Sequence, residues 1–390
     1  SDGSVFTPTS GTSNLRLGSG AGASIASGGN YNTVIGDSAG AGITTGDGNT
    51  GVGFNSLNAI TTGSLNTAVG NASLDASTTG ANNTAVGASA GTAVTTGVLN
   101  TFVGSNAGAA ATTADNNTAI GAYAFDAGTG GDNTAVGSGA LGGGSNTGTS
   151  NTAVGRDAGN SITSGTLNTL VGSLAGDALT DGEANVAIGY GALGAEDQAD
   201  ANVAIGVNTL ANQNAGTSES YNTAVGHNAG RQVTTGLRNT IIGGLAADAV
   251  TEGNNNVALG YNSLGADTKG SNSVAIGQGT LQAQNFTSAT NAYNVAVGHQ
   301  AGNLVTTGVQ NTLIGGLAGD ALTVGSYNVA LGTTALGGDT KGSKSTAIGY
   351  SALVNQNFTS ATDAYNTAVG YEAGQAVTTG VRNTLIGARS

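Results

Sequence analysis

The sequence predicts an all-β fold, a parallel β-solenoid of about 22 turns of roughly 17 residues each. The chain of 390 residues repeats a five-residue motif, Asn-(Thr or Val)-small-(Val, Ile or Leu)-Gly, from residue 14 to residue 387. Successive copies mostly lie 17 residues apart, with a few intervals of 16, 18, 20 or 21. A period in this range is typical of solenoids, in which each repeat buries its apolar side on its neighbours. We therefore expect an elongated rod, ~105 Å long if strands stack ~4.8 Å apart.

The composition favours an ordered, uncharged chain. Seventy residues are glycine, and charged residues make up 8% of the chain against roughly 25% in an ordinary soluble domain. Val, Ile and Thr recur in register, which argues against disorder. The net charge is −13 with nine Lys and Arg, so nucleic acid and anionic membrane surfaces are poor partners. The chain has no cysteine, which excludes disulfides and suits an exported protein. It also has no apolar run of the ~18 residues that membrane insertion requires.

The motif predicts a short strand followed by a corner. In Asn256-Val257-Ala258-Leu259-Gly260, Val257 and Leu259 share one face of the strand and Ala258 takes the other. A small residue on that second face allows another backbone or another subunit to approach closely. The motif glycine then turns the corner, because glycine alone accepts positive φ without strain. In the second half of the chain we assign this role to Gly226, Gly243, Gly260, Gly277, Gly298, Gly315, Gly332, Gly349 and Gly370.

A single turn is not stable alone, and the chain as a whole is organised by its repeats. Ordering 17 residues costs roughly 17–34 kcal/mol, whereas about four buried aliphatic side chains return ~1.5–3 kcal/mol each. Turns must therefore stack through ladder hydrogen bonds and through Asn and Thr side-chain ladders. We expect an extended N-terminal arm over residues 1–13 and a single continuous solenoid over residues 14–390. Residues 221–387 are built on a 72-residue super-repeat, whose inserted residues 285–290 and 357–362 predict loops on one edge.

One copy of the motif has a family resemblance. The segment Asn272-Ser273-Val274-Ala275-Ile276-Gly277 resembles the YadA-like head repeats of trimeric autotransporter adhesins. The turns with Thr-Thr-Gly-x-x-Asn-Thr are similar to repeats in phage and bacterial fibre proteins. The resemblance covers residues 14–387. It implies a left-handed parallel β-roll that trimerises side by side and is exposed on a cell surface or a virion.

No enzyme, cofactor or metal site is expected. His227 and His299 occupy equivalent positions, but the third copy is Tyr371, so we interpret them as solvated surface residues rather than ligands. The chain has no Gly-Lys-Ser/Thr sequence to bind phosphate. With two histidines on a repeating lattice, no Ser/His/Asp arrangement can be argued.

Two features are candidate binding surfaces. Phe286 and Phe358, with Tyr293 and Tyr365, place aromatic rings on or beside the inserted loops. Exposed rings grip sugars or proteins; the alternative is that they fold back over the widened turn. The paired threonines form a row that either binds ice or serves as a turn ladder, at positions 44–45, 61–62, 78–79, 95–96, 234–235, 306–307 and 378–379.

The sequence therefore predicts a non-enzymatic structural shaft of an extracellular fibre or adhesin. We expect a homotrimer, from the alternating Ala face and the family resemblance, with a host-cell glycan or surface protein as a further partner. Two alternatives remain open. One is a filament subunit that polymerises end to end, and the other is an ice-binding solenoid that uses its Thr row.

Overall fold

The computed structural model describes residues 10–216 and 219–390, and the predicted fold class is confirmed. These residues form about 22 stacked turns, roughly 17 residues apart, each contributing a short parallel strand to one sheet. Within the described residues there is no helix, and so none that is long and apolar enough to cross a membrane. The predicted N-terminal arm falls largely on residues 1–9, outside the described residues. The chain divides into two compact units, Ser1–Ala187 and Ile188–Ser390.

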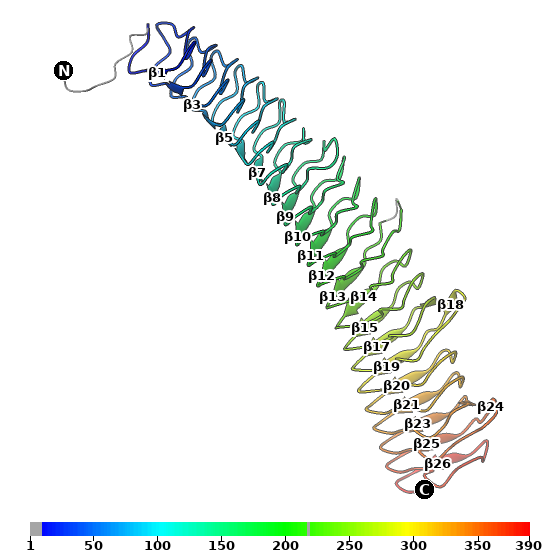
Figure 1. The fold of residues 1–390 in the computed structure, drawn as a ribbon. Coiled ribbons are helices and arrows are strands. Elements are labelled where there is room, and N and C mark those ends of the chain that lie inside the picture. Colours follow the sequence, from blue (N-terminus) through cyan, green and yellow to red (C-terminus); the bar gives the residue numbers. More distant parts are fainter. Residues whose placement is uncertain (1–9, 217–218) are drawn as a thin grey trace. The chain divides into compact units, whose positions relative to one another are not determined.

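In the first unit, the three-residue strands from β1 to β9 each pair in parallel with the strand one turn further on (Figure 1). Thr67 pairs with Thr84 and Val69 with Val86, so equivalent motif positions lie directly above one another. The strands are β1 (Leu15–Leu17), β2 (Thr33–Ile35), β3 (Thr50–Val52), β4 (Thr67–Val69), β5 (Thr84–Val86), β6 (Thr101–Val103), β7 (Thr118–Ile120), β8 (Thr134–Val136), β9 (Thr152–Val154) and β10 (Thr169–Val171). The unit boundary falls within β11 (Val186–Ile188).

The second unit continues the same pattern and adds short strand pairs at its 21-residue turns. Its strands are β12 (Val203–Ile205), β13 (Thr223–Val225), β14 (Thr240–Ile242), β15 (Val257–Leu259), β16 (Gly270–Ser271), β17 (Val274–Ile276), β18 (Thr290–Asn291), β19 (Val295–Val297), β20 (Thr312–Ile314), β21 (Val329–Leu331), β22 (Gly342–Ser343), β23 (Thr346–Ile348), β24 (Thr362–Asp363), β25 (Thr367–Val369) and β26 (Thr384–Ile386). The pairs β16–β18 and β22–β24 attach the two inserted segments to the preceding turn.

The strand faces point opposite to the expectation that Ala lines an approach surface for other subunits. Ala258 is fully buried, whereas Val257 is half-buried and Leu259 is 40% exposed. The expectation was wrong because the interior of a turn is narrow. Only a small residue fits there when a large side chain enters from the opposite wall, as Leu264 does in this turn. The branched residues of the strand therefore face outward.

Two core positions six residues apart share the interior of many turns: when one holds a large side chain, the other holds a small residue. The buried Ala68 is followed six residues later by the buried Leu74, whereas the large, buried Phe102 is followed by Gly108. A methyl group added at Gly108 would fall within the contact distance of the Phe102 ring. Where both positions are small, as at Ala85 and Gly91, the Leu74 and Phe102 side chains of the neighbouring turns lie next to the glycine and keep the interior closely packed.

A buried asparagine ladder joins the turns along the edge where each strand begins. The Asn66 backbone N–H donates to Asn49 Oδ1 at 3.0 Å, and its Nδ2 donates to the same oxygen at 3.1 Å. The same Nδ2 donates to the Gly80 carbonyl at 2.8 Å, so one side chain ties its turn to the turn on each side. Asn66 Oδ1 in turn accepts the backbone N–H of Asn83. Most turns of the described chain repeat this pattern with a fully buried Asn.

The motif glycines occupy a backbone conformation that excludes other residues. Their φ values in the second unit lie between 128° and 141° from Gly226 to Gly370. A Cβ at Gly260 would also lie 2.6 Å from the carbonyl carbon and oxygen of Gly277 in the next turn. Both the positive φ and the close stacking of backbones therefore require glycine at this corner.

Removing one ladder side chain should loosen the turns around it. In Asn100→Ala, the backbone N–H of Asn117 loses its acceptor at 2.9 Å and the Ala114 carbonyl loses a donor at 2.8 Å. We expect a loss of about 2–4 kcal/mol, since each buried group left unpaired costs ~1–3 kcal/mol. Hydrogen-exchange mass spectrometry across residues 83–117 measures it. The control is Asn71→Ala, an exposed asparagine at a position that is alanine (Ala88) one turn later; equal effects of the two variants would contradict the ladder.

The pairing of a large with a small residue in the core predicts that a second substitution restores stability lost by the first. Phe102→Ala should lower the free energy of unfolding by about 3–5 kcal/mol, because it leaves a cavity. Adding Gly108→Leu recreates the arrangement of Ala68 and Leu74 and should recover at least half of the loss. Urea denaturation of both variants measures the difference. A double variant less stable than Phe102→Ala would disprove this pairing.

Candidate functional site

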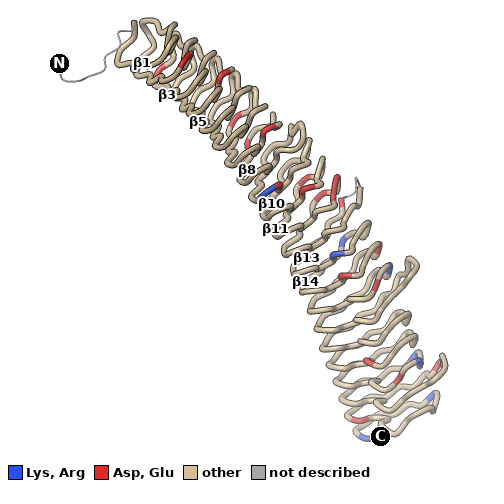
Figure 2. The backbone as a smooth tube through the Cα atoms, in the orientation of Figure 1, with Lys and Arg blue, Asp and Glu red and all other residues tan. Residues whose placement is uncertain are grey.

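The outer face of the sheet carries a column of exposed apolar side chains in each unit. We define it by the first and third residues of the three-residue strands. The third residue is Val, Ile or Leu in all 22 of these strands, and the first is Thr, Val or Leu. Val69 is 36% exposed, Leu259 40% and Leu331 44%. Figure 2 shows how sparsely charges are distributed, and none of them belongs to the outer face.

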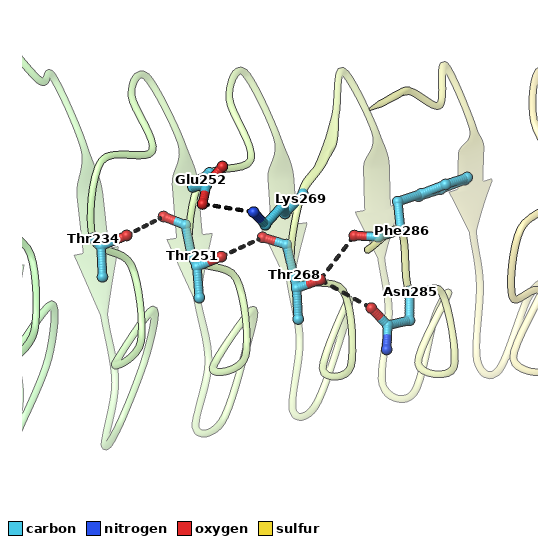
Figure 3. A network of polar contacts seen from close by, with 7 residues as sticks. All are labelled: Thr234, Thr251, Glu252, Thr268, Lys269, Asn285 and Phe286. Atoms are coloured by element: carbon cyan, nitrogen blue, oxygen red, sulfur yellow. Dashed lines mark hydrogen bonds and ion pairs between the residues drawn. The ribbon is translucent and has the colours of Figure 1, made fainter. Parts of the chain in front are cut away.

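The threonine row is a ladder between turns. Thr234 Oγ1 donates to the Thr251 carbonyl at 3.2 Å, and Thr251 Oγ1 donates to the Thr268 carbonyl at 3.0 Å (Figure 3). The hydroxyl hydrogen of the first threonine in each of these turns is thus used within the protein. In the neighbouring exposed column, Glu252 and Lys269 form an ion pair at 2.8 Å between turns. These contacts favour the turn-ladder interpretation over an ice-binding surface.

The two histidines are exposed. His227 and His299 each lie directly after a motif glycine, at the corner that follows the strand. Within residues 10–216 and 219–390, no group of three or more His, Cys, Asp or Glu side chains is arranged to hold a metal ion.

The widened turns place the four predicted aromatic residues in two different environments. Tyr293 and Tyr365 are exposed, at 52% and 48%. Phe286 and Phe358 are only 6% exposed, so the prediction of a binding surface is wrong for these two rings, and the alternative, that they fold back over the widened turn, is confirmed. The Phe286 backbone N–H donates to Asp267 Oδ1, and its carbonyl accepts from Thr268 Oγ1 at 2.8 Å (Figure 3). These bonds hold the phenylalanine over the widened turn.

A buried carboxylate and glutamine support each inserted loop. Asp267 Oδ2 accepts from Gln284 Nε2 at 2.6 Å, and Asp267 Oδ1 accepts the backbone N–H of Gly270 at 3.0 Å. Burial raises the pKa of Asp267, while the hydrogen bonds from Gln284 and the backbone oppose that shift. Asp339 and Gln356 repeat the arrangement at 2.6 Å in the next period.

This carboxylate–glutamine pair repairs the asparagine ladder where serine interrupts it. At Ser273, Gln284 Nε2 donates to the serine Oγ at 3.0 Å, and Gln284 Oε1 accepts from Asn294 Nδ2 at 2.8 Å. The glutamine thus takes over contacts that a ladder asparagine makes elsewhere. A buried polar residue is tolerated here because its hydrogen bonds are satisfied.

A related pair of buried polar side chains lies before the predicted super-repeat of residues 221–387. Glu196 and Gln213 are fully buried and lie seven residues after Gly189 and Gly206, as Asp267 lies after Gly260. Gln213 donates to Ser220 Oγ at 2.9 Å and accepts from Asn222 Nδ2. The signal was present in the sequence, because this position is Ile, Val or Leu in many other turns.

No known protein-family model matches the chain, and no curated protein matches it. The geometry above therefore carries the functional argument.

The two kinds of aromatic residue should respond differently to truncation. Phe358→Ala removes a buried ring and should destabilise the widened turn by about 3–5 kcal/mol. Tyr365→Ala removes an exposed ring and should change stability by less than ~1 kcal/mol. Hydrogen exchange over residues 339–366 compares them. Equal loss of protection in both variants would mean that Tyr365, too, is part of the core.

Proposed function

We propose that the chain is a non-enzymatic structural shaft of an extracellular fibre or adhesin, built from three copies that associate laterally through the outer face. The observation that carries the proposal is the aliphatic column of the strands within each unit, from Leu17 to Val171 in the first and from Ile205 to Ile386 in the second. Single exposed apolar residues are normal, but a contiguous apolar patch of several hundred Å² is typical of an interaction surface.

The size of the outer face fits a stable interface. In each unit about ten strands, ~4.8 Å apart and ~10 Å long, present roughly 500 Å². Each unit thus offers more than half of the ~800 Å² that each partner contributes to a standard interface, and the chain carries one such face in each unit. The face therefore has enough area for a lasting contact.

A second copy of the chain is the occupant that the face fits best. Its side chains recur at the spacing of stacked strands over many turns, and a partner matches that spacing throughout only if it has the same repeat. The similarity to YadA-like head repeats favours three copies around one axis. The absence of cysteine and the low charge suit a protein outside the cell, on a cell surface or a virion.

Charging the outer face should separate the copies. Light scattering on the native protein should give about three times the chain mass of 37.0 kDa. Leu259→Glu with Leu331→Glu places two carboxylates on the face, and we expect the mass to fall to that of one chain, because unpaired charges are costly to bury.

The matched control introduces the same charge elsewhere. Thr62→Glu with Thr307→Glu alters the exposed threonine column, in which Glu252 stands naturally, and should leave the native mass unchanged. A native mass of one chain, or loss of assembly in both double variants, would contradict lateral association through the outer face.

A further inference from the structure

Three exposed tyrosines of the super-repeat share the same backbone conformation and a similar exposed fraction. Tyr221, Tyr293 and Tyr365 follow one another at intervals of 72 residues. Their φ values are 49°, 50° and 50°, and they are 48%, 52% and 48% exposed. Each stands directly before a ladder asparagine, so a buried hydrogen-bond network fixes its backbone. A rigid, half-exposed ring offers an apolar face at low entropic cost.

Polar residues occupy the position of Tyr293 in the turns before and after it, Asn272 and Gln310. Asn272 Nδ2 donates to Asn291 Oδ1 at 2.8 Å, which links the two side-chain amides. The backbone N–H of Gln310 donates to the Ala292 carbonyl at 2.7 Å, which fixes the backbone of this exposed residue one turn after Tyr293. We call Tyr293, Asn272, Asn291 and Gln310 the Tyr293 site. It carries donors and acceptors but no charge.

Tyr365 has neighbouring residues at the same three positions of the repeat, but their side chains carry different chemical groups. Lys344 Nζ donates to Asp363 Oδ2 at 2.7 Å and to the Tyr365 hydroxyl at 3.1 Å. The ammonium lies 5.1 Å from the ring centroid, so it sits nearer the hydroxyl than the centre of the ring. The backbone N–H of Arg382 donates to the Ala364 carbonyl at 2.7 Å, as Gln310 does at the other site. We call Tyr365, Lys344, Asp363 and Arg382 the Tyr365 site.

The chemistry that the two sites share defines the ligand. Both offer an aromatic face flanked by a hydrogen-bonded donor–acceptor pair and by a further donor one turn away. The pair at the Tyr293 site consists of two amides, and the pair at the Tyr365 site consists of an ammonium and a carboxylate. A charged ligand would therefore suit only one of the two sites. Asp363 and the chain's net charge of −13 disfavour a polyanion. A ligand with apolar C–H faces and many hydroxyl groups fits both sites.

We propose that the Tyr293 and Tyr365 sites bind a neutral polysaccharide, with Tyr221 as a third position in the series. The two sites are four turns apart, or ~19 Å along the stack at ~4.8 Å per turn. One long polysaccharide chain reaches both, and the second contact is then made at high effective concentration. Weak single contacts thereby give a strong overall attachment. The inference goes beyond the lateral assembly proposed above.

A glycan microarray that carries neutral and acidic polysaccharides tests the proposal with the full chain. We expect binding to neutral glycans, at least tenfold weaker in Tyr293→Ala or Tyr365→Ala and absent in the double variant. Tyr293→Phe with Tyr365→Phe keeps the rings and should retain most of the binding. The control, Tyr190→Ala with Tyr261→Ala, removes exposed tyrosines at the opposite corner and should bind within twofold of the native chain.

Three results would overturn the proposal: no binding to any neutral glycan, binding to acidic glycans alone, or undiminished binding by the Tyr293→Ala/Tyr365→Ala variant. Light scattering on the same samples reports assembly separately, so a failure of glycan binding is distinguishable from a failure of the outer face.

Discussion

The buried asparagine ladder is the interaction on which the rest of this structure depends. Strands of three residues make up only a small part of each turn, and a single turn buries too little apolar surface to stabilise itself. Each ladder asparagine adds bonds to the turn before and the turn after, as Asn66 does with Asn49 and Gly80. Because the amide is buried, its donors and acceptors have no water to replace those partners, and breaking one contact is costly. The ladder therefore fixes the register that places equivalent residues above one another.

That register determines what lies inside and outside. With the asparagine buried, the middle residue of the strand is also turned inward, where Ala258 and its equivalents leave room for the opposite wall. Val and Ile then face outward in a column, which supplies the surface for assembly. The same frame accepts loops where the ladder is interrupted. At Ser273 and Ser345, Gln284 and Gln356 restore the missing hydrogen bonds, and the widened turn presents an exposed tyrosine.

The periodicity of the sequence was enough to predict the fold, but it did not indicate which face of each strand is buried. The spacing of the motif was enough to predict parallel turns, the strand positions and the glycine corners. Alternation in Val257-Ala258-Leu259 shows that two faces exist, but which face is buried depends on the width of the turn. That width is set by partners such as Leu264 across the interior. Similarly, the sequence left open whether Phe286 is exposed or folds back over the turn, because its burial depends on the Asp267–Gln284 pair, whose members are distant in sequence and unremarkable singly.

Hydrogen exchange of the native chain tests the ladder most directly. Backbone N–H groups of the motif asparagines, such as Asn66, Asn83 and Asn239, donate to a buried side-chain oxygen and should exchange more slowly than any others in their turns. The exposed second threonines, such as Thr62, should exchange much faster. Asparagine N–H groups that exchange as quickly as those threonines would contradict the claim that the ladder holds the turns together.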